Sequence, residues 1–422
     1  MEYIVINGQK PLKGNVVISG AKNAAVAIIP AAVASGGICI IDNVPYIEDV
    51  INLTRTLESI GAKCEFKDDN HTLVIDSTSI QSHVIGEKLA KSTRASYYFM
   101  GALLARFGKV TMPVPGGCEI GLRPMGYHLK GFEALGATCK QEHGTVEIVA
   151  KNGLRGGNIY LDSPSVGATI NIMLAAVFAK GITTIENSAK EPHVVDTASF
   201  LNKLGAKISG AGTDTIRIVG VGNLSGGEYT IIPDQIETGT YMIAAAITGG
   251  DVTVENIIPK HMDSLTSKLR EIGVKITEGL DSIRVKVDCP LKGCEVKTAY
   301  YPGFPTDLQP QMATLLCTGT TSSIVTENIF ESRFRYVGEL RRLGAPVRVD
   351  MRSLVIQGNY VLTGAKVRAS DLRAGAALVL AGLAARGETM ISGIEHLDRG
   401  YECLEEKLRG LGADIKRVTQ KD

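Results

Sequence analysis

The stretch LESIGAK, at residues 57–63, recurs along the chain with small changes and decides how the fold is read. Five later versions are FEALGAT (132–138), LNKLGAK (201–207), LREIGVK (269–275), LRRLGAP (340–346) and LRGLGAD (408–414). The shared glycines lie 75, 69, 68, 71 and 68 residues apart. A period of about 70 residues is too long for one solenoid turn and fits a small supersecondary unit. The sequence therefore predicts six repeats, and differences between the repeats should mark the function.

Each repeat has the same predicted order of elements. It begins with a helix that is apolar on nearly every face, such as KNAAVAIIPAAVAS from Lys22, which indicates burial on all sides. A glycine ends this helix, a β-branched strand such as GDVTVEN follows, and an amphipathic helix then ends at the glycine of the recurring phrase. Two strands complete the repeat. The predicted fold class is α/β, with one βαβαββ unit repeated six times.

The length predicts more than one domain. A chain of 422 residues is too long for one ordinary core, and six units fit two domains of three. We place the crossings near residue 21 and near residues 231–234. One domain then contains residues 22–231, and the other contains residues 1–21 plus 232–422. Because the last repeat is unfinished at the C-terminus, the N-terminal strand is expected to complete it.

The composition excludes several classes of function. With 45 basic and 44 acidic residues, the net charge of +1 argues against a nucleic-acid partner bound through bulk charge. The most apolar stretch, residues 376–385, is too short to span a bilayer, and the N-terminus lacks a signal peptide. The eight cysteines have no zinc-like spacing. We therefore expect a cytoplasmic protein with free thiols and with no metal, cofactor, membrane contact or obligatory protein partner.

The buried helices begin with charged residues that an apolar helix does not need. They are Lys22 with Asn23 in the first repeat, Arg94 in the second, Asp307 in the fifth, and Asp371 with Arg373 in the sixth. A cation at the N-terminus of a helix opposes the helix dipole unless an anion lies nearby, so the pattern predicts phosphate sites. For Asp307, a helix N-cap is an equally open interpretation.

The second repeat contains the largest departure, PVPGGCEIGLRPMGYHL at residues 113–129. Its Pro-Gly-Gly entry predicts a mobile loop with unusual backbone angles, and long loops in compact repeats are usually functional. Cys118 could be an inert small hydrophobe. Its neighbours are glycines and Arg123, however, and an arginine lowers a thiol pKa from about 8.5, which favours an acid or a nucleophile.

Further candidates lie in the last two repeats. They are Arg333 and Arg335 in FESRFRY, and His396, Asp398 and Arg399 in HLDRGYE. Each alone is typical of a solvated surface. Together with the cysteine and the helix-start residues they predict an acid, a base and a cluster of cations for a small, highly charged substrate.

These motifs resemble those of the UDP-N-acetylglucosamine 1-carboxyvinyltransferase family over essentially the whole chain. The most specific are SGAKNAA (19–25), PGGCEIGLRP (115–124), SVGAT (165–169), FPTDLQ (304–309), FESRF (330–334), SDLRA (370–374) and DRGYE (398–402). The resemblance implies two inside-out α/β domains, each of three βαβαββ repeats, with the active site in the cleft between them. It implies transfer of the enolpyruvyl group of phosphoenolpyruvate to the 3′-hydroxyl of UDP-N-acetylglucosamine, through a tetrahedral ketal, as the first committed step of peptidoglycan synthesis.

The resemblance also implies roles for individual residues. Cys118 matches the cysteine that protonates the methylene carbon, forms a covalent adduct and reacts with fosfomycin, and Asp307 matches the general base. The matching cations are Lys22, Arg123 and Arg399 for phosphate, with Arg94, Arg333 and Arg373 as further cations. The remaining expected substrate contacts are Asn23, Pro124, Met125, Gly126, Tyr127, Ser163, Pro164, Ser165, Val166, Ile329 and Asp371.

Two residues depart from the family pattern, and three alternative functions stay open. Ser163 stands where some members have Lys, and His193 stands where an acidic residue is expected and is predicted to lie at the surface. The alternatives are the sister enzyme acting on shikimate 3-phosphate, an RNA 3′-terminal phosphate cyclase, and a non-catalytic relative kept for binding or regulation. The loop cysteine argues against the first and the near-neutral charge against the second. The presence of the predicted catalytic residues argues against the third.

Overall fold

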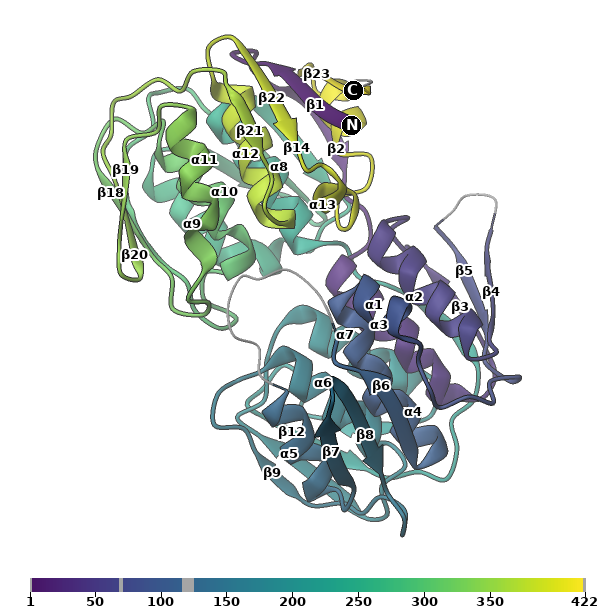
Figure 1. Cartoon of the computed structure of the whole chain (residues 1–422). Coiled ribbons are helices and arrows are strands. Elements are labelled where there is room, and N and C mark those ends of the chain that lie inside the picture. Colours follow the sequence, from purple (N-terminus) through teal and green to yellow (C-terminus); the bar gives the residue numbers. More distant parts are fainter. Residues whose placement is uncertain (1, 68–70, 116–124, 420–422) are drawn as a thin grey trace. The chain divides into compact units, whose positions relative to one another are not determined.

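A computed structural model describes residues 2–67, 71–115 and 125–419 of the chain (Figure 1). These residues form two compact units. The first unit contains residues 20–115 and 125–232, and the second contains residues 2–19 and 233–419.

The crossings between the units differ slightly from those predicted. Gly20, Ala21 and Ile232 belong to the first unit rather than the second. Local contacts agree with this assignment, because the Ala21 amide donates to the carbonyl of Ile232 at 2.7 Å and the adjacent Ile231 amide donates to the carbonyl of Asp42 at 3.0 Å. Gly20 also lies so close to Asn43 that a Cβ atom at Gly20 would be 1.6 Å from the carbonyl oxygen of Asn43.

Each repeat of the first unit forms its own small sheet. Repeat 1 has the order β13 (Gly227–Thr230), β3 (Ile38–Asp42), β5 (Leu73–Asp76), β4 (Lys63–Phe66). Repeat 2 has β6 (Lys109–Pro113), β8 (Thr145–Val149), β7 (Thr138–Glu142). Repeat 3 has β9 (Asn158–Tyr160), β10 (Ile182–Glu186), β12 (Thr215–Val219), β11 (Lys207–Ser209). In the four-stranded sheets, the first strand is parallel to its neighbour and the other pairs are antiparallel.

The second unit repeats this arrangement three more times. Repeat 4 has β2 (Lys13–Val17), β14 (Asp251–Glu255), β16 (Ser282–Lys286), β15 (Lys275–Glu278). Repeat 5 has β17 (Glu295–Lys297), β18 (Ser323–Thr326), β20 (Ser353–Ile356), β19 (Val347–Asp350). Repeat 6 has β21 (Lys366–Arg368), β22 (Glu388–Ser392), β1 (Glu2–Asn7), β23 (Asp414–Thr419). The strand β1 lies between β22 and β23, which confirms that the N-terminal strand completes the last repeat.

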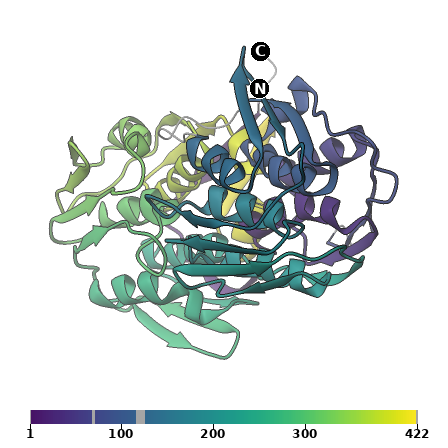
Figure 2. The ribbon, with the colours of Figure 1, turned by 90° about the horizontal axis from the view of Figure 1, so that it is seen from below.

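Helices fill the interior of each unit, and the sheets lie outside them (Figures 1 and 2). The buried helices are α1 (Lys22–Ala31), α4 (Tyr98–Phe107), α6 (Val166–Ala176), α8 (Gln235–Ile247), α10 (Gln309–Leu316) and α12 (Leu372–Ala384). In α12, every residue from Leu372 to Leu383 is buried, which confirms the prediction from the all-round apolar sequence. Within the second unit α8, α10 and α12 pack against one another.

The amphipathic helices cover the buried ones and end at the recurring phrase. They are α2 (Glu48–Ser59), α5 (Gly126–Ala134), α7 (Pro192–Lys203), α9 (Asp263–Glu271), α11 (Val337–Arg342) and α14 (Leu404–Gly410). The six glycines that follow them have φ between 83° and 108°. Side chains other than hydrogen are strained at such angles, so glycine there confirms the predicted helix ends.

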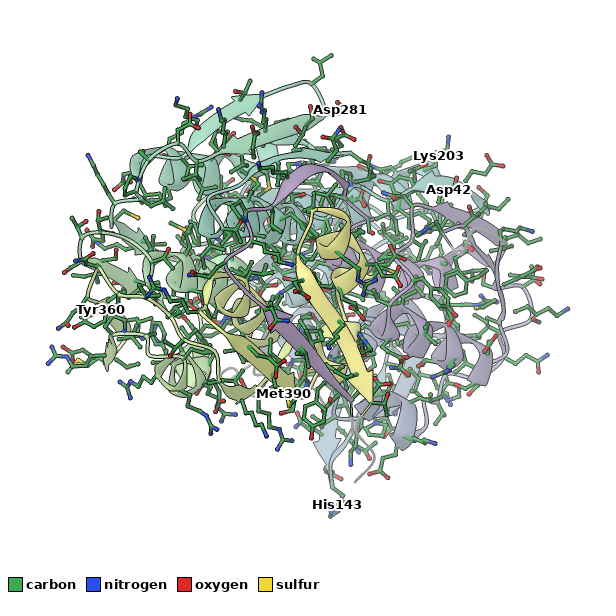
Figure 3. All side chains as sticks on the ribbon, turned by 90° about the horizontal axis from the view of Figure 1, so that it is seen from above. Asp42, His143, Lys203, Asp281, Tyr360 and Met390 are labelled. Atoms are coloured by element: carbon green, nitrogen blue, oxygen red, sulfur yellow. The ribbon has the colours of Figure 1, made fainter. Side chains whose placement is uncertain are left out.

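Short helices make the remaining connections. They are α3 (Glu87–Ser92), α13 (Glu395–Asp398), η1 (Ala32–Ser35), η2 (Arg94–Tyr97), η3 (Pro259–Met262), η4 (Thr306–Leu308) and η5 (Arg333–Tyr336). In the described ranges no helix is long and apolar enough to cross a membrane. Figure 3 shows side chains extending outward around the chain, including His143 in the turn between β7 and β8.

Shortening the side chain of Ile4 should destabilise the second unit, because this fully buried residue of β1 pairs with both β22 and β23. We expect Ile4→Ala to lower the free energy of unfolding by about 3 kcal/mol, through lost burial and a residual cavity. Denaturant unfolding followed by circular dichroism measures the loss. Val17→Ala, at an exposed position of β2, is the control and should change little. Equal effects of the two substitutions would contradict this role of β1.

Candidate active site

Lys22 is the first residue of α1, and its charge meets a buried carboxylate in the first unit. The Lys22 Nζ atom lies 3.0 Å from Asp49 Oδ2. Asp49 belongs to the first turn of α2 and its residue is 2% exposed. The pair therefore balances the cation that opposes the dipole of α1, and it holds the ammonium at the start of the helix. Asp49 was missed at the sequence level, where it resembles an ordinary acidic residue in the first turn of a helix.

A buried polar network lies next to Arg94, between α4, α5 and α6. Asn171 Oδ1 accepts a hydrogen bond from the Gly101 amide at 2.8 Å, so the Asn171 Nδ2 atom is the donor on its other side. It donates to the Tyr97 carbonyl and to His128 Nδ1, both at 2.9 Å. Accepting this bond leaves the proton of neutral His128 on Nε2. Burial, followed by the charge of Arg94, lowers the pKa of His128 to about 3.

The SVGAT motif begins α6 beside this network. Ser165 caps the helix, because its hydroxyl oxygen accepts a hydrogen bond from the Ala168 amide at 3.3 Å. A Cβ atom at Gly167 would lie 3.0 Å from the Tyr97 hydroxyl oxygen and 3.1 Å from His128 Cε1, so glycine allows the close approach. The backbone N–H groups at the start of such a helix favour a bound anion. Ser163 and its neighbours through Val166 are half-buried at this helix start.

Asp307 is the centre of a second cluster, in the second unit. Arg333 Nη2 donates to Asp307 Oδ1 at 2.9 Å. Arg373 donates to the other oxygen, Oδ2, from Nε at 3.2 Å and from Nη2 at 3.0 Å. Both guanidinium groups are almost fully buried, whereas the Asp307 side chain is 29% exposed. The carboxylate is therefore held from two sides, and its side chain remains partly exposed.

The second arginine of this cluster is itself fixed by the start of α12. Asp371 caps the helix by accepting hydrogen bonds from the amides of Arg373 and Ala374 at 3.0 and 3.1 Å. The Arg373 guanidinium also lies over the ring of Tyr401, with 5.6 Å from Cζ to the ring centroid. Burial alone would lower the pKa of Arg373, but the charges of Asp307, Tyr401 and Asp234 and the hydrogen bond to Asp307 together outweigh it, and the pKa is raised. Arg373 therefore stays a cation in a buried place.

Several sequence predictions are corrected by these positions. The N-cap interpretation of Asp307 is wrong, since Pro305 precedes η4, Leu308 precedes α10, and the carboxylate pairs with two arginines. The predicted surface position of His193 is also wrong, because this residue is 8% exposed in the first turns of α7. The face of α7 that carries His193 packs against the core. The sequence around His193 did not indicate which face of the helix would be buried.

The remaining candidates of the last two repeats lie outside the Asp307 cluster. Arg335 is exposed, two residues after the buried Arg333. Asp398 pairs with Arg417, at 2.6 and 3.1 Å, and so stabilises the end of α13 instead. Arg399 follows that helix and is half-buried.

The loop predictions lie partly outside the described residues. Cys118, Arg123 and Pro124 belong to residues 116–124, for which the structure gives no description. Met125 immediately precedes α5, which begins at Gly126, and Tyr127 is half-buried in its first turn. Among the residues that the structure does describe, no group of three His, Cys, Asp or Glu side chains could hold a metal ion.

Residues 6–408 match the family described as EPSP synthase (3-phosphoshikimate 1-carboxyvinyltransferase). The chain belongs to the enolpyruvyl transferase family. A relative from Caldanaerobacter subterraneus, UDP-N-acetylglucosamine 1-carboxyvinyltransferase 3, is 55% identical over all of both chains. UDP-N-acetylglucosamine 1-carboxyvinyltransferase 2 from Clostridium acetobutylicum is also 55% identical, over 99% of both.

Solved structures of this enolpyruvyl transferase family share the fold. The enolpyruvyl transferase NikO from Streptomyces tendae has a TM-score of 0.90 at 28% identity and covers 100% of this chain and 99% of its own. EPSP synthase from Acinetobacter baumannii has a TM-score of 0.76 at 20% identity, over 99% of this chain and 100% of its own, which supports the fold alone. The α/β fold class predicted from the repeats is thereby confirmed.

The imidazole of His128 should stay neutral in the folded protein down to strongly acidic pH. Folding lowers its pKa from 6.5 to about 3. The unfolded chain therefore binds the proton first, and the contribution of His128 to stability is complete above pH 6.5 and is lost as the pH falls toward 3. NMR of histidine-labelled protein, with His128→Gln to assign the signal, measures the titration. Titration of that signal near 6.5 in the folded protein would contradict the buried network.

Proposed function

We propose that this protein transfers the enolpyruvyl group of phosphoenolpyruvate to the 3′-hydroxyl of UDP-N-acetylglucosamine and releases phosphate. The observation that carries the proposal is the partly exposed Asp307 carboxylate, which two buried arginines hold. The names of the relatives that are 55% identical over nearly the whole chain support the same acceptor. The reaction is the first committed step of peptidoglycan synthesis.

The proposed substrates are strongly anionic, and the candidate residues fit this charge. Phosphoenolpyruvate carries about three negative charges near neutral pH. A cation at about 4 Å from one such charge contributes about 4 kcal/mol at an effective dielectric constant of about 20. Lys22, Arg123 and Arg399 are the proposed phosphate ligands. Arg94 and the N-terminus of α6 are proposed to bind the diphosphate of the nucleotide sugar.

The proposed chemistry needs one acid and one base. In the addition step, Cys118 gives its proton to the methylene carbon of phosphoenolpyruvate while the sugar oxygen bonds to the adjacent carbon. Asp307 takes the proton of the 3′-hydroxyl. In the elimination step, the Cys118 thiolate takes a proton back from the same methyl carbon and the double bond forms again. The carbon–oxygen bond to phosphate breaks, and the phosphate leaves with the proton that Asp307 held. Arg333 and Arg373 orient the carboxylate of this base through their hydrogen bonds.

The acceptor decides between this function and its alternatives. Phosphate release from phosphoenolpyruvate is measured with UDP-N-acetylglucosamine and with shikimate 3-phosphate in separate reactions. We expect release with the nucleotide sugar and none with shikimate 3-phosphate. Release with shikimate 3-phosphate alone would assign the protein to the sister activity. No phosphate release with either acceptor would indicate a non-catalytic relative.

Removing the loop thiol should abolish turnover without unfolding the protein. We expect Cys118→Ser to lower kcat by at least about 100-fold, because a serine hydroxyl is a much weaker acid than a thiol. The melting temperature and circular dichroism spectrum serve as the folding control. Substitution of the exposed Cys289 by Ser is the matched control and should leave the rate unchanged. A wild-type rate for Cys118→Ser would refute the assigned role.

Fosfomycin gives an independent test of the same residue. We expect one covalent adduct at Cys118, formed faster when UDP-N-acetylglucosamine is present. Peptide mass spectrometry with and without the nucleotide sugar locates the adduct. An adduct at another cysteine, or none at all, would be inconsistent with Cys118 as the reactive thiol.

A further inference from the structure

The turn after the central strand of each sheet differs between the repeats. In repeats 1, 3, 4 and 6 this turn begins with one residue in the left-handed conformation. These residues are Asn43, Asn187, Asn256 and Gly393, with φ of 57°, 55°, 56° and 72°. The residue that follows each of them is buried, and these residues are Val44, Ser188, Ile257 and Ile394. A neutral side chain thus occupies this inward-facing position in four repeats.

Repeat 5 lacks the inserted left-handed residue. Glu327 directly follows β18, and its amide donates to the carbonyl of Arg352 at 2.8 Å. In repeat 4 the equivalent bond is made by Ile257, one residue later, to the carbonyl of Asp281 at 3.0 Å. Asn328, which comes next in repeat 5, is absent from the positive-φ residues in the described part of the chain. Glu327 therefore occupies the inward-facing position and is 1% exposed.

The buried carboxylate of Glu327 accepts three hydrogen bonds. Its Oε1 atom accepts from the amide of Ile329 at 2.8 Å and from the amide of Phe330 at 3.1 Å. Its Oε2 atom accepts from the hydroxyl of Thr306 at 3.1 Å. Within residues 2–67, 71–115 and 125–419, no Lys or Arg forms an ion pair with Glu327 at 4.0 Å or less. The carboxylate is therefore stabilised by hydrogen bonds from two separate segments of the chain.

These two segments carry the candidate residues of the second unit. Thr306 precedes Asp307 in the chain, and its carbonyl accepts hydrogen bonds from Arg333 Nε at 3.2 Å and Nη2 at 2.9 Å. The same Nη2 atom donates to Asp307 Oδ1. Ile329 lies on the other segment, two residues after Glu327. Glu327 thus ties the peptide of Ile329 to the turn that presents the carboxylate of Asp307.

Folding alone does not require a carboxylate at this position. Repeats 1, 3, 4 and 6 carry Val, Ser or Ile at this position. A buried carboxylate costs free energy unless its hydrogen bonds compensate for lost hydration. We propose that Glu327 is a positioning residue that fixes the backbone of Ile329 and Phe330 against the Thr306–Asp307 turn. Ile329 on one segment and Asp307 on the other are then both placed to contact the acceptor sugar. This inference rests on the proposed function.

The experiment replaces Glu327 by the residue that other repeats carry. In Glu327→Ile, an apolar side chain fills the position as Ile257 and Ile394 do, but the three hydrogen bonds are lost. Glu327→Gln keeps an acceptor oxygen for the two amides and is the conservative variant. Glu255→Gln, at the half-buried end of β14 in the same unit, is the matched control. Steady-state phosphate release gives kcat and the KM of each substrate, and thermal unfolding reports the fold.

We expect Glu327→Ile to raise KM for UDP-N-acetylglucosamine about tenfold, as lost positioning hydrogen bonds would. KM for phosphoenolpyruvate should stay within about twofold, and Glu327→Gln should restore KM for the sugar to within about threefold of wild type. A purely structural role would reduce the active fraction and kcat, but would leave both KM values unchanged. Unchanged KM for the sugar in Glu327→Ile, or equal impairment in the Gln variant, would overturn the proposal.

A second variant covers the case in which Glu327→Ile does not fold. Thr306→Val keeps the shape of the side chain and removes the single donor that links Glu327 to the Asp307 turn. It should raise KM for the sugar about threefold while KM for phosphoenolpyruvate stays unchanged, and an unchanged KM for both would overturn the proposal. A wild-type enzyme that releases no phosphate with the nucleotide sugar would refute the proposed function itself, which is a separate outcome.

Discussion

Every repeat begins with a helix that must be covered on all sides, and the architecture follows from this constraint. A helix without a polar face loses the stabilisation from burial wherever it meets water. Three such helices pack together in each unit, and the three small sheets and the amphipathic helices enclose them. The N-terminal strand β1 also helps to cover the helices of the second unit, because the sheet of repeat 6 would otherwise lack the strand between β22 and β23.

The same constraint explains where the functional groups lie. A fully buried helix leaves its ends as the places where polar side chains meet solvent or each other. Lys22, Arg94 and Asp307 all lie at such helix starts. Two of them are balanced by a buried partner, Lys22 by Asp49 and Asp307 by Arg373. The apolar interior thereby supplies rigid supports for a charged site.

The repeats also show how a shared scaffold acquires a specialised position. The turn after β18 has one residue fewer, so Glu327 is buried, whereas Glu255 at the end of β14 is half-buried. The carboxylate of Glu327 then accepts hydrogen bonds from the amides of Ile329 and Phe330. A change of register by one residue is enough, because successive residues at the end of a strand point to opposite faces.

The sequence by itself determined the repeat, the α/β class, the all-round burial of the helices and the glycine helix ends, because periodicity and glycine requirements are local properties. The charged helix starts could be predicted as well, since they break a local rule. The partners of those charges were decided only by tertiary structure. Asp49 lies 27 residues from Lys22, Arg373 lies 66 from Asp307, and the burial of His193 and Glu327 depends on which face of an element packs inward. Such contacts depend on packing between distant segments, which no local pattern encodes.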